Sequence, residues 1–249
     1  MKYFFEIGYL GTAYHGWQIQ HNAISVQGII NDRLEKLLGK EIKTVGSGRT
    51  DTGVHAICQF FHIETQSEID TKQILFKMNT MLPDDIAVYA IRRVKDDANA
   101  RFDAIFRSYV YKISRAKNPF LKERAYHFYR PLDIQLMNDA AKILIGKHNF
   151  QAFSRVKTQV NHFICDVDKM IWSEKDDILL FHIRADRFLR GMVRAIIGTL
   201  LQVGEYRIKP DQVKKILESG DRRKAGHAVP PEGLYLEKII YPENLFSDS

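Results

Sequence analysis

The sequence has few cysteines and no long apolar run. Cys58 and Cys165 are the only two cysteines among 249 residues, so they cannot form a disulfide framework, and nothing near them has metal-ligand spacing. The longest apolar stretch, AIIGTLLQV, is far shorter than the roughly 20 residues of a membrane-spanning helix. Glu6 interrupts the first apolar run, which argues against a signal peptide. We therefore expect a cytoplasmic protein without a membrane anchor.

The two halves of the chain differ in their balance of charge, because acidic residues do not offset the basic residues of the second half. Residues 1–105 hold 12 Lys and Arg against 13 Asp and Glu, whereas residues 106–249 hold 25 against 17. A basic half favours a polyanionic partner, because each neutralised phosphate releases condensed counterions. The other interpretation is a solubilising surface charge, and charge alone does not decide between the two.

The pattern of apolar, capping and turn residues in the first half predicts the element order β-α-β-β-α-β. Ser25 is placed as a helix N-cap and Gly39 as the residue that ends this helix, and Pro83 ends the second helix. The expected strands are KYFFEIGY, IKTVGSG, AICQFFHIET and IAVYAIRRV.

The second half repeats the order with insertions. We expect strands at FRSYVYKI, FICDVDKMIW, DILLFHIRA and LYLEKII, a helix from Asp133 to Gly146, and helices over 188–204 and PDQVKKILESG. Two such halves in tandem indicate an α+β protein of ferredoxin-like halves. The expected boundary lies near residues 100–106, which gives an N-terminal half, 1–105, and a basic C-terminal half, 106–249.

The segment GSGRTDTGVHA, residues 46–56, is the most unusual part of the sequence. It holds three glycines together with Arg49, Asp51 and His55 between two predicted strands. Glycine permits close backbone approach, and an aspartate is ionised at neutral pH, so Asp51 could act as a nucleophile or base. The alternative is that Asp51 caps a turn and that Arg49 lies on the surface.

Three other segments carry candidate functional residues. The opening loop, residues 8–20, contains Tyr9, Tyr14 and Trp17, which could stack on bases or fill space over the first strand. Tyr109 and Tyr111 share one face of a predicted strand, where they either contact a ligand or pack in the core. The segment from Arg187 to Gly198, taken as helical, places three arginines on one stripe that is either solvated or pairs with Asp51: Arg187, Arg190 and Arg194.

Taken together, these segments resemble the bacterial tRNA pseudouridine synthase A family (TruA). The resemblance runs nearly the whole length, and its motifs are GTAYHGWQIQ with SVQ, GRTDTGVHA, ARFDA with RSYVY, FLRGMVRAIIGTLLQVG and PPEGLYL. It implies a pseudouridine synthase fold, with a central mixed and largely antiparallel sheet and an active-site cleft between the two halves. It also implies a homodimer that needs no cofactor or metal.

The resemblance implies that the substrate is the tRNA anticodon stem-loop, with uridines 38, 39 and 40 as targets. Asp51 matches the family's catalytic aspartate, and the residues that match substrate-contacting positions are Tyr109, Arg49, Arg194 and Leu236. Arg194 matches the arginine expected to pair with the aspartate.

Three positions differ from the usual family pattern, and two other functions remain open. Leu10, Asn99 and Gly191 stand where Asp, His and a larger residue are usual, so a related synthase with a shifted RNA target is an alternative. A non-catalytic RNA-binding module explains the charge and the aromatics but not GRTDTGVHA. A small-molecule hydrolase using Asp51 and His55 has no use for the basic half.

Overall fold

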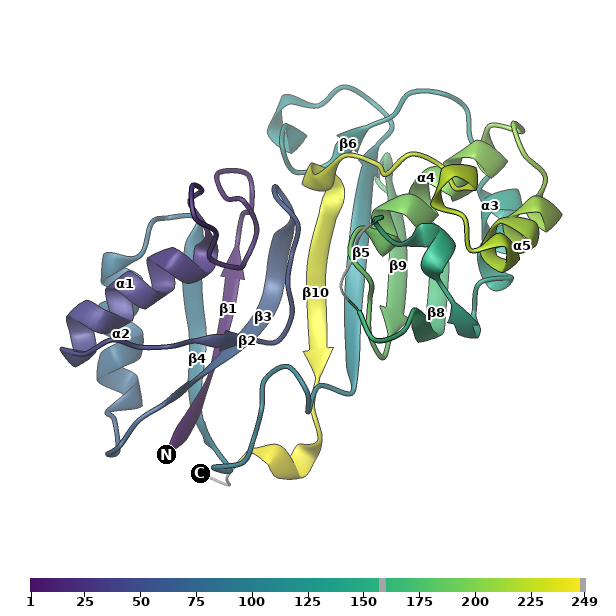
Figure 1. Cartoon of the computed structure of the whole chain (residues 1–249). Coiled ribbons are helices and arrows are strands. Elements are labelled where there is room, and N and C mark those ends of the chain that lie inside the picture. Colours follow the sequence, from purple (N-terminus) through teal and green to yellow (C-terminus); the bar gives the residue numbers. More distant parts are fainter. Residues whose placement is uncertain (157–159, 247–249) are drawn as a thin grey trace. The chain divides into compact units, whose positions relative to one another are not determined.

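The computed structural model describes residues 1–156 and 160–246 (Figure 1). By its internal contacts the chain forms two compact units: unit 1 contains Met1–Ile105 and Tyr235–Ser249, and unit 2 contains Phe106–Leu234. The expected second half, 106–249, differs from unit 2 because its C-terminal part belongs to unit 1. Residues 247–249 of that expected half lie outside the described part.

Unit 1 contains a sheet in the order β4-β1-β3-β10, with β2 paired to β3. Its elements are β1 (Lys2–Tyr9), α1 (Val26–Leu38), β2 (Val45–Gly46), β3 (His55–Glu64), α2 (Thr71–Met81), β4 (Ile86–Val94), β10 (Leu234–Ile240) and the 3-10 turn η5 (Glu243–Leu245). Strand β1 runs antiparallel to β3 and β4, whereas β10 runs parallel to β3, which explains why the C-terminal segment joins this unit.

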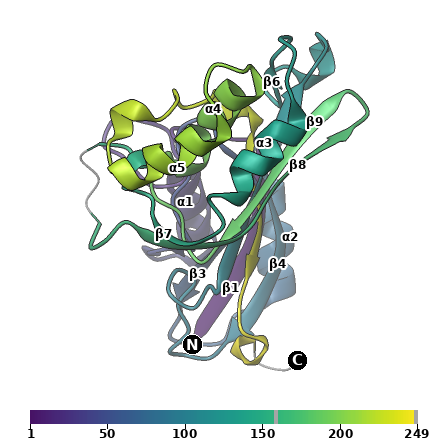
Figure 2. The same cartoon turned by 90° about the vertical axis from the view of Figure 1, so that its right-hand side faces the viewer.

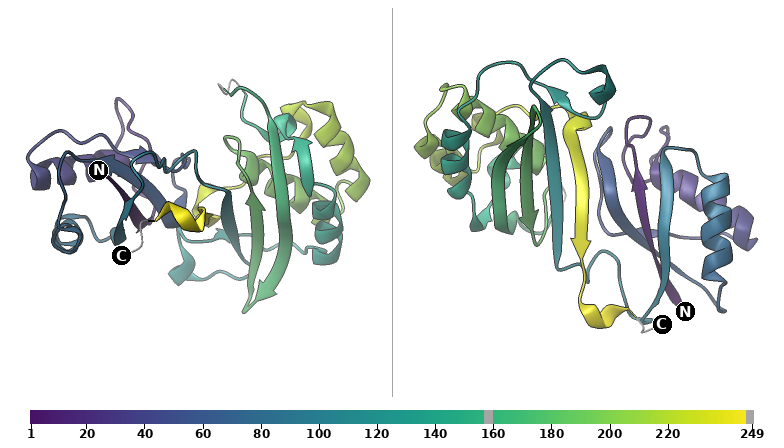
Figure 3. Two further views of the ribbon diagram at one scale, coloured as in Figure 1. Left: turned by 90° about the horizontal axis from the view of Figure 1, so that it is seen from below. Right: turned by 180° about the vertical axis from the view of Figure 1, so that it is seen from behind.

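Helix α1 begins and ends at the predicted residues, and α2 ends shortly before Pro83 as expected. The Ser25 side chain accepts a hydrogen bond from the Gly28 amide at the start of α1, and Gly39 ends the helix with a left-handed φ of 67°. Helices α1 and α2 contact each other (Figure 3). The core of this unit contains aromatic side chains from neighbouring strands. Phe5 on β1 and Phe61 on β3 are fully buried and stack with ring centroids 4.7 Å apart.

Unit 2 contains a sheet in the order β5-β9-β8-β7, with β6 paired to β5. Its strands are β5 (Phe106–Ser114), β6 (Tyr126–His127), β7 (Gly146–Asn149), β8 (Ile164–Lys175) and β9 (Ile178–Ala185). Its helices are α3 (Ile134–Lys142), α4 (Met192–Gly204) and α5 (Pro210–Ser219), with 3-10 turns η1 (Pro119–Leu121), η2 (Gln151–Phe153), η3 (Arg222–Lys224) and η4 (Pro231–Gly233). The expected α+β class and predominantly antiparallel pairing are confirmed.

Helix α4 forms the centre of unit 2. Every residue of this helix except Arg194 and Gln202 is buried, and α3 packs against both α4 and β8 (Figure 2). A Cβ at Gly198 would lie 1.8 Å from the His227 carbonyl oxygen, and one at Gly226 would lie 2.6 Å from the Gly198 backbone. The chain after η3 therefore packs directly against the backbone of α4, which only glycine permits at these two positions.

The predicted helix over 188–204 is wrong at its start. Helix α4 begins at Met192, because Gly191 adopts a left-handed φ of 72° and interrupts the helical backbone. Arg187 and Arg190 therefore precede the helix, and the predicted stripe with Arg194 does not form. Gly191, one of the departures from the family pattern, is the residue type best suited to this conformation.

The pH dependence of unit 1 stability can be predicted from His62 on β3. This imidazole is 3% exposed, and its Nδ1 accepts a hydrogen bond from the Ala100 amide at 3.1 Å. Burial, with a smaller contribution from the charge of Lys2, lowers its pKa to about 4. A histidine in the unfolded chain binds its proton near pH 6.5, so the unfolded state is favoured as pH falls from about 6.5 to about 4.

We expect His62→Asn to remove this dependence while keeping an acceptor for the Ala100 amide. Urea unfolding between pH 4 and 7 measures the free energy of unfolding. As pH falls, this free energy should decrease more steeply for wild type than for the variant, by up to about 1.4 kcal/mol per pH unit. His21→Asn, at an exposed position, controls for the loss of an imidazole. Parallel curves for wild type and His62→Asn would contradict the prediction.

Candidate functional site

The loop that carries Asp51 is bonded to the sheet of unit 1 at its start and closed by a backbone turn before β3. At its start, the Ser47 amide donates to the Phe60 carbonyl at 2.8 Å, and the Ser47 Oγ accepts from the Phe60 amide at 3.3 Å. At its end, the Val54 amide donates to the Asp51 carbonyl at 3.1 Å. The Asp51 carboxylate is half-buried, and Arg49 is exposed. The Asp51 side chain is therefore held on a hydrogen-bonded turn and remains partly accessible.

The opening loop supports the Asp51 loop by direct backbone packing. A Cβ at Gly16, whose φ is +84°, would lie 2.2 Å from the Thr50 carbonyl oxygen, and one at Gly11 would lie 2.0 Å from the Val54 carbonyl oxygen. The Gly53 amide donates to the Tyr14 carbonyl at 3.2 Å. These glycines are required because any side chain at either position would push the two loops apart.

The aromatic residues of the opening loop pack inside unit 1. Tyr9, Tyr14 and Trp17 are 2–4% exposed, so the base-stacking interpretation is wrong for these three rings. The Tyr9 hydroxyl lies 2.9 Å from the Thr50 Oγ1, and the Tyr14 hydroxyl donates to Asp85 at 2.5 Å. The hydroxyls therefore connect this loop to the Asp51 loop and to the chain before β4.

His55 contributes to the framework of the Asp51 loop. Its ring is fully buried and stacks on Tyr235 with centroids 4.6 Å apart, and its Nδ1 accepts from the Gly11 amide at 2.8 Å. A nitrogen that accepts this bond carries no proton, so it is not free to serve as a base. This arrangement argues against the hydrolase interpretation.

Leu236 lies beside the end of the same loop. Strand β10 pairs with β3 so that Tyr235 is opposite His55 and Leu236 is opposite Ala56. The Leu236 side chain is 2% exposed. Unit 1 thus contains three of the five predicted site residues: Arg49, Asp51 and Leu236.

Unit 2 contains the other two predicted site residues, Tyr109 and Arg194. Tyr109 is opposite Ile183 in the β5–β9 pair, is half-buried, and meets Phe188 edge to face at 5.0 Å. The Arg194 Nε donates to the Val229 carbonyl at 2.6 Å, and the Val229 amide donates to the Arg194 carbonyl at 3.2 Å. This pair of bonds holds Arg194 in place. Arg194 is one of the two residues of α4 that are not buried.

Tyr111, which shares the strand face of Tyr109, is a core residue. It is fully buried, its hydroxyl donates to the Pro230 carbonyl at 2.9 Å, and burial raises its pKa. Because Pro230 directly follows Val229, β5 and α4 are both tied to this short segment.

Gln59 supports the Asp51 loop, although the sequence analysis did not identify it. Its side chain is fully buried on β3, and Nε2 donates to the Gly48 carbonyl at 3.1 Å. Its Oε1 has no hydrogen-bond partner in the part of the chain that the structure describes. A polar residue at an inward strand position near the glycine loop was the available sequence signal.

Asn99, which stands where His is usual in the family, has a hydrogen-bonded side chain. Its side-chain Oδ1 accepts from the Arg101 backbone amide at 2.9 Å, and the Asn99 backbone amide donates to the Asp103 carboxylate at 2.7 Å. These bonds close the turn that contains ARFDA. The Asn99 side chain therefore has a local structural role.

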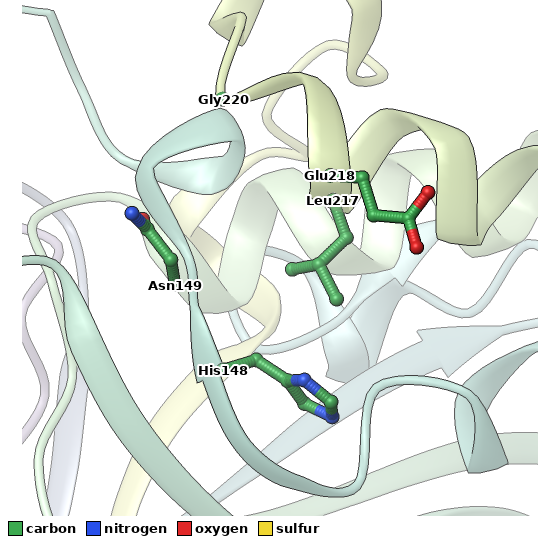
Figure 4. A pocket seen from close by; sticks show the side chains of 5 residues that line it. All are labelled: His148, Asn149, Leu217, Glu218 and Gly220. Carbon is green, nitrogen blue, oxygen red and sulfur yellow. The ribbon is translucent and has the colours of Figure 1, made fainter.

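A separate hollow of about 200 Å³ lies in unit 2 (Figure 4) and is lined by His148, Asn149, Leu217, Glu218 and Gly220. None of the predicted site residues lines it. Among the described side chains, no group of three or more His, Cys, Asp and Glu is arranged to hold a metal ion. Within residues 1–156 and 160–246, no helix has both the length and the apolar character needed to cross a membrane.

Comparison with known proteins identifies the family. The family model described as tRNA pseudouridine synthase matches residues 7–103 and 140–242. The chain is 43% identical to the tRNA pseudouridine synthase A of Bacteroides thetaiotaomicron, with 99% of this chain and 93% of that protein covered, and 44% identical to that of Bacteroides fragilis, with 98% of each covered. A Thermoanaerobacter tRNA pseudouridine synthase A is 41% identical, with 94% of this chain and 97% of that protein covered.

The chain therefore belongs to the tRNA pseudouridine synthase family, whose members are isomerases. This confirms the resemblance found in the sequence motifs. A solved chain of a Cbf5-Nop10-Gar1 complex aligns with a TM-score of 0.34 at 13% identity over 80% of this chain and 54% of that chain, a similarity too low to inform the site.

We expect Gln59→Met to displace the Asp51 loop, because the Gly48 carbonyl loses its donor while the buried volume is nearly kept. The turnover number on tRNA should fall about tenfold or more, and KM should change little. Gln73→Met, at an exposed position of α2, is the matched control.

A Gln59→Glu variant separates positioning from general destabilisation. Its protonated carboxyl group can donate to Gly48, so its activity relative to wild type should recover as pH falls. Wild-type turnover in Gln59→Met, or a flat ratio across pH in Gln59→Glu, would show that the bond to Gly48 does not position the loop.

Proposed function

We propose that the protein isomerises uridine to pseudouridine in the tRNA anticodon stem-loop, at positions 38, 39 and 40, with Asp51 as the catalytic residue. The observation that carries the proposal is the half-buried Asp51 carboxylate on a hydrogen-bonded glycine loop, in a chain of the tRNA pseudouridine synthase family. A non-catalytic RNA-binding module would not need a carboxylate held in this way.

The reaction explains why a fixed carboxylate is needed. Uracil leaves the ribose C1′ through N1, turns, and rejoins C1′ through C5, and the hydrogen at C5 is released as a proton while N1 gains one. Asp51 either attacks C1′ to form a covalent intermediate or removes a C2′ proton to form a glycal. Both routes require an ionised oxygen beside the sugar, and neither adds an atom to the product.

The remaining site residues are proposed to bind the substrate. A stacked uridine must first be extruded, at a cost of about a few kcal/mol. Arg49, which is exposed, is suited to contact the extruded nucleotide. Leu236, which is 2% exposed, is proposed to belong to the apolar layer beneath the ring, as the resemblance to the family implies. In unit 2, Tyr109 offers an aromatic face and Arg194 a guanidinium held by Val229.

The distribution of charge supports the proposal that unit 2 makes most of the contacts with the RNA backbone. Residues 106–234 hold 24 Lys and Arg against 14 Asp and Glu, whereas the residues of unit 1 hold 13 against 16. Because tRNA is a polyanion, binding should weaken steeply with added salt. We further propose that the enzyme works as a homodimer in the cytoplasm and uses no cofactor, as its resemblance to the family implies.

We expect Asp51→Asn to bind tRNA almost as wild type does and to form no detectable product, because the shape of the side chain is kept and its charge is lost. Tritium release from tRNA labelled at uridine C5 measures turnover, and a filter assay measures binding. Asp84→Asn, at an exposed position before β4, is the control and should retain full activity. Turnover by Asp51→Asn would refute the catalytic role.

A further inference from the structure

Residues 115–130 of unit 2 form a basic excursion that follows the end of β5 and returns along β6, which pairs with β5 (Figure 2). This 115–130 excursion contains one acidic residue, Glu123, and five basic residues: Arg115, Lys117, Lys122, Arg124 and Arg130. Lys117, Lys122 and Arg124 are exposed. Positive charge is thus concentrated in a short surface segment that the catalytic proposal does not use.

Two aromatic rings in the same excursion face solvent. Phe120 is 86% exposed and Tyr129 is 72% exposed, while most of the large apolar side chains of unit 2 are buried. Leaving a phenylalanine ring in water is unfavourable unless a partner covers it. Exposed rings between lysines and arginines are the combination that stacks unpaired bases and binds phosphates.

The excursion is held in place by its own hydrogen bonds. The two terminal nitrogens of Arg115 donate to the Phe128 and Arg130 carbonyls at 2.9 and 2.8 Å. The Asn118 Oδ1 accepts from the Phe120 amide at 2.9 Å, which caps the short η1 turn. Phe120 is therefore presented on an ordered turn, so that little conformational entropy is lost when a base stacks on it.

We propose that the 115–130 excursion is a second RNA-contacting surface, on which an unpaired base stacks on Phe120 while Lys117 and Lys122 contact neighbouring phosphates. The identity of the RNA as tRNA rests on the proposed function. Ser114, where the excursion begins, is five residues along β5 from Tyr109, which is roughly 17 Å in an extended strand. The excursion therefore contacts a part of the RNA other than the target uridine.

Charge favours RNA over a second copy of this chain. A two-fold interface centred on the excursion would bring the lysines and arginines of two excursions together. Like charges in contact oppose association, whereas a phosphate backbone neutralises them.

The test compares two matched sets of exposed residues in the full-length protein. The first set is Lys117, Phe120 and Lys122 in the excursion, and the second is Lys72, Phe76 and Lys77 on α2 of unit 1, where Phe76 is 74% exposed. Each phenylalanine is changed to alanine in one variant, and each lysine pair to alanine in another. Kd for tRNA is measured by fluorescence anisotropy at several salt concentrations, and turnover is measured at saturating tRNA.

Phe120→Ala should weaken tRNA binding about 5-fold or more without changing the salt dependence. The Lys117→Ala/Lys122→Ala variant should weaken binding and reduce the slope of log Kd against log salt by about 1 to 2. Turnover at saturation should stay within about 2-fold of wild type, because the target uridine is bound elsewhere. The α2 variants should match wild type in every measurement.

Two results would overturn the proposal. One is wild-type tRNA affinity in both excursion variants, or an equal loss in the α2 variants. The other is a change of oligomeric state in Phe120→Ala, measured by sedimentation, that accounts for any loss of binding. Binding and turnover are measured separately, so a wild-type protein that binds tRNA through the excursion but forms no pseudouridine would refute the proposed function alone.

Discussion

The site of unit 1 depends on contact between two backbones. Gly11 and Gly16 let the opening loop lie directly against Val54 and Thr50, at distances that no side chain would permit. The buried Tyr9 hydroxyl and the Gly53 amide add hydrogen bonds across the same contact. The proposed role of Asp51 requires a carboxylate on a rigid support, and this packing holds the loop that carries it.

Glycines also allow two backbone segments to come into contact in unit 2. Gly198 and Gly226 let the segment that precedes β10 pack against α4, and this segment then holds Arg194 through Val229 and Tyr111 through Pro230. The unit that carries most of the positive charge thus also fixes one guanidinium by backbone carbonyls.

Much of the fold could be predicted from the sequence, because local signals agreed with the final structure. The Ser25 cap and Gly39 stop of α1, and the Asp133 cap of α3, are encoded within a few residues. The two-residue strand β6 and the four-residue strand β7 were missed, since their pairing depends on distant partners rather than on their own pattern. The start of α4 was misplaced because a glycine can either continue or interrupt a helix.

The candidate site was predicted less completely than the fold. The motif singled out Asp51 and Arg49, but composition could not tell that Tyr9, Tyr14 and Trp17 are buried or that His55 is engaged by the Gly11 amide. Gln59 was missed because a single inward glutamine is a weak signal, and its partner, the Gly48 carbonyl, is known only from the folded structure. Such roles depend on tertiary contacts, which a single sequence does not display.

The most direct test maps pseudouridine in tRNA from cells whose only copy of this gene encodes Asp51→Asn. We predict unmodified uridine at positions 38, 39 and 40, with pseudouridine elsewhere in the same tRNAs unchanged. Pseudouridine retained at those three positions would contradict the assignment of Asp51 as the catalytic residue.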